Sequence, residues 1–223
     1  MDEPKFTTGQ ERLGFVRKVY GILASQICFT AVMTIIPCVS YDARLAVLSY
    51  PSLAFLAIFV ALGSMCALFC CDLDRKVPTN YTLLGVFTVA EAYTVMFVCA
   101  TVKNPLIVLQ AALLTAGIVI GLTVYAVTSK RDFTTCGAFL FMFSFAMLAF
   151  SMICMIIGFQ LPTLYCVFGV VLFGLYLIFD TQLILGGKAH SFDEDQYILA
   201  AICLYMDIIN IFLYLLQILN SEN

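Results

Sequence analysis

Seven apolar segments, each long enough to cross a bilayer, take up nearly all of this 223-residue chain. A helix needs about 20 apolar residues to cross about 30 Å of hydrocarbon. The mean hydropathy is +1.03 and only 11% of residues are charged, whereas soluble proteins average about 25%. The chain is therefore expected to be an all-α integral membrane protein, a bundle of seven transmembrane helices. The segments lie near 19–39, 47–71, 81–101, 105–128, 134–158, 161–184 and 197–219.

Short polar connections separate these segments, which predicts that consecutive helices are antiparallel neighbours. The expected organisation is a tail over 1–18, a membrane domain over 19–219 and a short tail over 220–223. Nine of the 11 Lys and Arg residues lie in the first tail and the even-numbered connections, and Arg44 and Lys103 lie on the other side. Because basic residues remain in the cytosol, the N-terminus is predicted to be cytosolic and the C-terminus to lie across the membrane.

Polar residues follow one another along the last segment at helical spacing. Steps of four, three, four and three residues place them on one face, which apolar residues flank. Because lipid offers polar groups no partners, such a face turns toward the other helices. The last helix is therefore predicted to be central and to line a pathway. The residues of this face are Cys203, Asp207, Asn210, Tyr214 and Gln217.

Two acids inside the membrane are the principal candidates for function. A charged aspartate at mid-bilayer costs about 2.5–3.5 kcal/mol on insertion scales, so such residues mark ion or proton pathways. Asp180 lies about one turn from the cytosolic end of the sixth segment, and Asp207 lies about ten residues, or ~15 Å, along the seventh. A bend near Gly186 and Gly187 would allow their carboxyl groups to meet.

If Asp180 and Asp207 meet, they share a proton and titrate as a coupled pair. The protonated pair would join the two helices through a hydrogen bond. The ionised pair would repel and offer the oxygen ligands that Ca²⁺ prefers. The pattern thus predicts a pH-gated cation site that binds Ca²⁺ transiently; a purely structural hydrogen-bonded pair is the alternative.

A third intramembrane acid, Glu91, lies in the third segment between Thr88 and Thr94. Two interpretations stand side by side: Glu91 lines the same path as the aspartates, or it is a protonated carboxyl group satisfied by a neighbouring helix. With Asn210, Tyr214 and Gln217 it completes the set of candidate pore-lining residues.

Other classes of function fit the sequence less well. Intramembrane zinc hydrolases need several His or Cys ligands, and the one histidine, His190, lies in a connection. No lysine lies deep enough in a segment to form a retinal Schiff base. No basic run exceeds two residues, so nucleic acid is not an expected partner. We expect no enzyme activity and no cofactor; the expected partners are membrane lipid, protons and Ca²⁺.

Several stretches resemble the Bax-inhibitor-motif membrane proteins, in their lifeguard and Golgi anti-apoptotic branch. The last segment, YILAAICLYMDIINIFLYLLQIL, is similar to the carboxyl-terminal signature of that family, and LYLIFDTQLILGGK is similar to its sixth-helix motif. Further similar stretches are FVRKVYGILASQI, DRKVPTNYTLLGVFTVAEAYTV and QAALLTAGIVIGLTVYAVTSKRDF. The resemblance covers essentially the whole chain.

This resemblance implies seven helices with the last one central, and a proton-sensitive Ca²⁺ leak in the Golgi or endoplasmic reticulum that suppresses apoptosis. By motif, Asp180 and Asp207 match the family's pH-sensing pair. Bacterial relatives place an arginine in the second helix, but none occurs here between Arg44 and Arg75, and the chain ends SEN rather than in a basic tail. Six spans plus a re-entrant segment is an alternative topology. A non-conducting scaffold that binds membrane proteins of apoptosis signalling is the alternative function.

Overall fold

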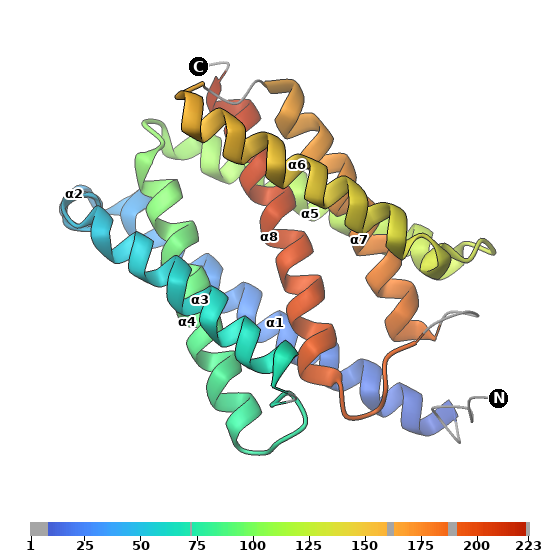
Figure 1. Ribbon diagram of the computed structural model, residues 1–223. Helices are drawn as coiled ribbons and strands as arrows, with labels where there is room; N and C mark the ends of the chain where they lie inside the picture. Colours follow the sequence, from blue (N-terminus) through green and yellow to red (C-terminus); the bar gives the residue numbers. More distant parts are fainter. Residues whose placement is uncertain (1–8, 72, 160–162, 187–190, 222–223) are drawn as a thin grey trace. The chain divides into compact units, whose positions relative to one another are not determined.

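The protein is built from helices throughout the part of the chain that the computed structural model describes, residues 9–71, 73–159, 163–186 and 191–221 (Figure 1). No strand occurs over these residues. The elements in order are α1 Gly9–Val39, α2 Tyr41–Ser49, α3 Pro51–Cys70, α4 Thr79–Thr101, α5 Pro105–Thr128, the 3₁₀ helix η1 Phe133–Thr135, α6 Gly137–Ile157, α7 Thr163–Leu185 and α8 Tyr197–Ser221.

Seven of the described helices are long and apolar enough to cross a membrane, which confirms the predicted all-α membrane architecture. The shortest, α3, has 20 residues and so extends ~30 Å at ~1.5 Å per residue. The most buried is α8, with 56% of its most apolar window buried, against 17% for α6. This burial agrees with the central place predicted for the last helix.

Two helix boundaries differ from the sequence prediction. The first helix begins at Gly9, so its polar first turns lie in the region predicted to be a tail. The segment predicted over 47–71 is interrupted, because α2 ends at Ser49 and α3 begins at Pro51. A proline fits the first position of a helix, since its missing N–H would have no partner there, but it does not fit the interior of one.

Local sequence accounts for several of the helix ends. The Ser40 hydroxyl accepts a hydrogen bond from the Ala43 N–H and caps α2. Gly158 adopts a left-handed conformation (φ 74°) at the end of α6, and Gly186 has a φ of 86° directly after α7. Glycine is the residue that takes these angles without steric cost.

The described chain divides into two compact units, each with its own core. The first unit contains residues 1–108 and 193–205. Within it, α4 packs against both α1 and α3. Small buried residues of α3, including Ala54, Ala61 and Ser64, allow close approach of helices in lipid, where packing rather than water exclusion drives association.

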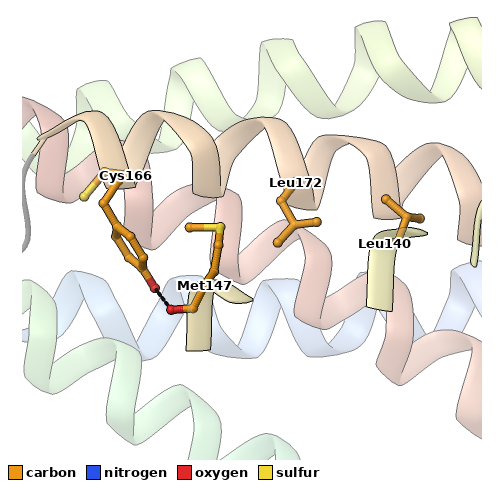
Figure 2. Close-up of a cluster of buried hydrophobic side chains, with 5 residues drawn as sticks. Leu140, Met147, Cys166 and Leu172 are labelled. Atoms are coloured by element: carbon orange, nitrogen blue, oxygen red, sulfur yellow. Dashed lines mark hydrogen bonds between the residues drawn. The ribbon is translucent and has the colours of Figure 1, made fainter. Parts of the chain in front are cut away.

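The second unit contains residues 109–192 and 206–223, so α8 contributes to both units. Its core lies between α6 and α7, where Leu140 and Met147 meet Cys166 and Leu172 (Figure 2). The dashed line in Figure 2 is the hydrogen bond that the Tyr165 hydroxyl donates to the Met147 carbonyl, at 3.3 Å.

Candidate functional site

The carboxyl groups of Asp180 on α7 and Asp207 on α8 are hydrogen-bonded to each other. Both residues belong to the second unit, and their exposed fractions are 6% and 4%. The contact between these two carboxyl groups, which the sequence allowed but did not establish, is therefore present. It joins two apolar helices through a pair of acids.

A hydrogen bond between two carboxyl groups requires a proton, because an ionised carboxylate only accepts. Asp180 and Asp207 thus hold at least one proton between them in this arrangement. The Oδ2 atom of Asp207 is buried and has no hydrogen-bond partner among the described residues. Removal of the shared proton would leave two like charges in contact, shielded from water, where Coulomb repulsion is strongest.

Two hydroxyl-bearing residues of α7, Tyr176 and Thr181, lie near Asp180 in the sequence. Tyr176, one turn before Asp180 on α7, lies within electrostatic range of both carboxyl groups. Its hydroxyl is hydrogen-bonded to the Ser144 hydroxyl of α6, with the two oxygens 2.9 Å apart. The Thr181 hydroxyl is fully buried and has no hydrogen-bond partner in the described chain. Of these two hydroxyl groups, the one of Tyr176 interacts with the acid pair electrostatically.

The other polar residues of α8 lie in different environments. The Asn210 amide donates to the Met206 carbonyl of its own helix at 2.8 Å. The Tyr214 ring packs against Tyr165 and Phe173, with ring centres 6.0 Å from each. Gln217 is exposed. Their predicted role in lining a pore remains a prediction.

Glu91 lies in the first unit, on α4, and is partly buried. It lies within electrostatic range of Tyr205 on α8, whose hydroxyl is 2.8 Å from the Thr30 hydroxyl of α1. Thr30 donates its own proton to the Gln26 carbonyl, so Tyr205 is the donor between the two hydroxyls. Both interpretations of Glu91 stay predictions.

Two buried glutamines, one in each unit, make polar contacts that the sequence prediction did not include. Gln26 on α1 donates its side-chain amide to the Thr88 hydroxyl of α4 at 2.9 Å. Gln182, two residues after Asp180, makes three hydrogen bonds: to the last turn of α5, to the connection that follows it, and to the start of η1. A glutamine in an apolar segment predicts a buried partner, but the sequence alone does not identify that partner.

The acid pair is not a complete metal site by itself. No three His, Cys, Asp or Glu side chains gather within the described ranges, whereas Ca²⁺ takes six to eight oxygen ligands. Two carboxyl groups supply too few oxygen ligands for stable Ca²⁺ binding, and the predicted transient binding of Ca²⁺ stays a prediction.

Comparison with known proteins identifies the family. The family model described as "Inhibitor of apoptosis-promoting Bax1" matches residues 12–223. The chain is 36% identical over 221 residues to protein lifeguard 4 of Mus musculus, which covers 95% of this chain and 87% of that protein. It is also 36% identical over 218 residues to protein LIFEGUARD 4 of Arabidopsis thaliana, covering 94% of this chain and 85% of that protein.

A viral relative is similar to the same extent. The chain is 35% identical over 214 residues to the Golgi anti-apoptotic protein of Vaccinia virus strain Lister, which covers 95% of this chain and 87% of the viral protein. These matches extend over nearly the whole chain and include both helices that carry the acid pair. The chain therefore belongs to the Bax1-inhibitor family, as its last two segments indicated.

Proposed function

We propose that this protein is a proton-sensitive, Ca²⁺-permeable leak channel of an intracellular membrane, which lowers stored Ca²⁺ and thereby suppresses apoptosis. The observation that carries the proposal is the hydrogen bond between the buried carboxyl groups of Asp180 and Asp207. Family membership and the names of the lifeguard and Golgi anti-apoptotic relatives support the role in apoptosis.

The acid pair acts as the gate in this proposal. With a shared proton, Asp180 and Asp207 hold α7 and α8 together. When the proton leaves, repulsion between two buried carboxylates separates the helices and exposes four oxygen atoms that attract a divalent cation. Flux is therefore expected to rise with pH.

The distribution of Lys and Arg supports a cytosolic N-terminus, and the viral relative's name supports a Golgi membrane. In this orientation the end of α7 faces the cytosol, and Asp180 lies close to that side. The gate then responds to cytosolic rather than lumenal pH. We propose no catalytic role for the chain.

The test is Ca²⁺ flux from liposomes that contain the purified full chain, between about pH 6 and about pH 8, a range that carboxyl groups can reach when burial opposes their ionisation. Wild-type flux should rise over this range. Asp207→Asn keeps a hydrogen-bond donor and removes the shared proton, so its flux should be independent of pH. The matched control is Asp195→Asn, the same chemical change at an exposed residue between α7 and α8.

Asp180→Asn should abolish the pH response in the same way. The double variant should resemble either single one, because both changes remove the same interaction. Wild-type flux equal to that of empty liposomes at every pH would refute the channel and favour the non-conducting scaffold. A pH response that survives in Asp207→Asn would place the gate elsewhere.

A further inference from the structure

In the second unit, a pocket of 390 Å³ lies beside the C-terminal ends of α5 and α7. Its walls come from the last turn of α5, the connection to η1 and the last turn of α7. Polar and charged residues form much of the lining, among them Ser129, Lys130, Arg131, Asp132 and Gln182. The proposed gate uses none of these side chains.

The charge of this pocket favours an anion. Lys130 and Arg131 are both exposed, so their cationic groups are available to a ligand. The one acid of the lining, Asp132, accepts hydrogen bonds from the N–H and hydroxyl of Thr134 at 3.0 and 2.6 Å. One oxygen of its carboxylate is therefore engaged by Thr134, and two cationic side chains face this single acid in the lining. Adjacent Arg and Lys side chains match the oxygen atoms of a phosphate group.

The backbone of the pocket is held in place by Gln182. The Gln182 amide donates to the carbonyls of Ala126 and Arg131 at 3.3 and 2.9 Å, and its carbonyl accepts from the Phe133 N–H at 2.8 Å. The Ser129 hydroxyl accepts from the Arg131 N–H at 3.2 Å, so the Ser129 proton is not used in that bond. A site that is formed before its ligand arrives loses less entropy on binding.

The position of the pocket identifies the source of the anion. The α5 side chains next to it face outward, with exposed fractions of 57% for Val124, 44% for Tyr125 and 58% for Val127. Apolar residues with a tyrosine mark the boundary between hydrocarbon and headgroups. A ligand that reaches the pocket from the adjoining bilayer can keep its acyl chains along α5. The volume is also larger than one phosphate ion needs and lies within the range of small-molecule sites.

We propose that this pocket binds the phosphate-bearing headgroup of an anionic membrane lipid. Lys130 and Arg131 pair with the phosphate, the Ser129 hydroxyl donates to it, and the acyl chains lie against the exposed face of α5. Basic pockets between transmembrane helices commonly take such headgroups on the cytosolic side, which is the side predicted here. Lipid binding does not depend on ion conduction, so a result against either the lipid site or the channel leaves the other proposal unaffected.

The test is native mass spectrometry of the full chain in detergent, titrated with short-chain phosphatidylinositol 4-phosphate as the probe. Each basic residue near a membrane surface contributes about a 5-fold gain in affinity. Lys130→Gln and Arg131→Gln should therefore each weaken binding about 5-fold, and the double variant about 25-fold. All three changes are at exposed positions and should leave the thermal unfolding midpoint unchanged.

The matched control is the double variant Arg17→Gln and Lys76→Gln, which removes two exposed basic residues of the same predicted side outside the pocket. Its affinity should stay within about 2-fold of wild type, as for surface charges away from a site. Equal losses of affinity in the control and in the pocket variants would overturn the assignment of lipid binding to this pocket. Equal binding of phosphatidylcholine would overturn the role of charge. Inositol 1,4-bisphosphate or inorganic phosphate binding as tightly as the lipid would overturn the lipid source in favour of a soluble anion.

Discussion

The register between α7 and α8 depends on the absence of a side chain at Gly169. A Cβ atom added there would lie 2.5–2.7 Å from three ring atoms of Tyr214, far inside ordinary van der Waals contact. The Tyr214 ring has little room to turn away, because Tyr165 and Phe173 flank it with ring centres at 6.0 Å. Gly169→Ala should therefore force the two helices apart near this contact.

The cost follows from overpacking. Extra methylene groups in a filled core cost about 1–3 kcal/mol, and the short distances at Gly169 indicate the upper part of that range. For a chain of this length each 1 kcal/mol lowers the unfolding midpoint by about 2–4 °C. Thermal unfolding of the purified variant in detergent should show a decrease of about 4–12 °C.

Two further variants make this prediction specific. Gly117→Ala is the matched control, since a Cβ atom there meets nothing within 4 Å, and its midpoint should not fall. Tyr214→Leu should recover part of the stability lost in Gly169→Ala, because the smaller side chain vacates the space. An unchanged midpoint in Gly169→Ala, or no recovery in the double variant, would refute the packing of Tyr214 against α7.

Three other contacts give predictions of different size. Gln182→Leu leaves three backbone groups without their partner and should lower the free energy of unfolding by about 1–3 kcal/mol. Hydrogen exchange should increase in the connection after α5. The increase should be smaller in Gln182→Glu, which keeps the acceptor. Thr30→Val and Tyr205→Phe should show a coupling energy of about 0.6 kcal/mol in a double-mutant cycle of unfolding, as for other hydrogen bonds within membranes, and strict additivity would contradict the bond. Arg75→Ala should cost less than about 1 kcal/mol, because the Arg75–Asp193 ion pair is exposed; a larger loss, or one that persists at high salt, would be unexpected.

The spans could be predicted closely because composition alone determines them. A run of about 20 apolar residues has few other stable structures in a bilayer, where backbone groups must be satisfied internally. The separate helix α2 was missed because Tyr41–Ser49 is short and precedes an apolar run without a charge at the break. Pro51 is the signal that marks this break, since proline begins helices more readily than it continues them.

The polar contacts between helices were less predictable. The face of α8 that carries Asp207 followed from periodicity, and the partner Asp180 followed from being the one acid in the preceding segment. By contrast, Thr30 and Tyr205 lie 175 positions apart in the chain. Neither residue type is unusual in an apolar segment. Contacts of this kind depend on the rotation of each helix about its axis, which one sequence does not specify.

The chemistry of the acid pair itself argues for a role beyond packing. Neutral polar contacts in the same protein, such as Ser144 with Tyr176 and Gln26 with Thr88, join helices without any dependence on a captured proton. An asparagine at Asp180 or Asp207 would supply a permanent donor and join α7 to α8 in the same way. Two acids make the contact conditional on a proton, and their ionised form is costly in a bilayer. A contact between helices that is lost when a proton leaves is what a gate requires.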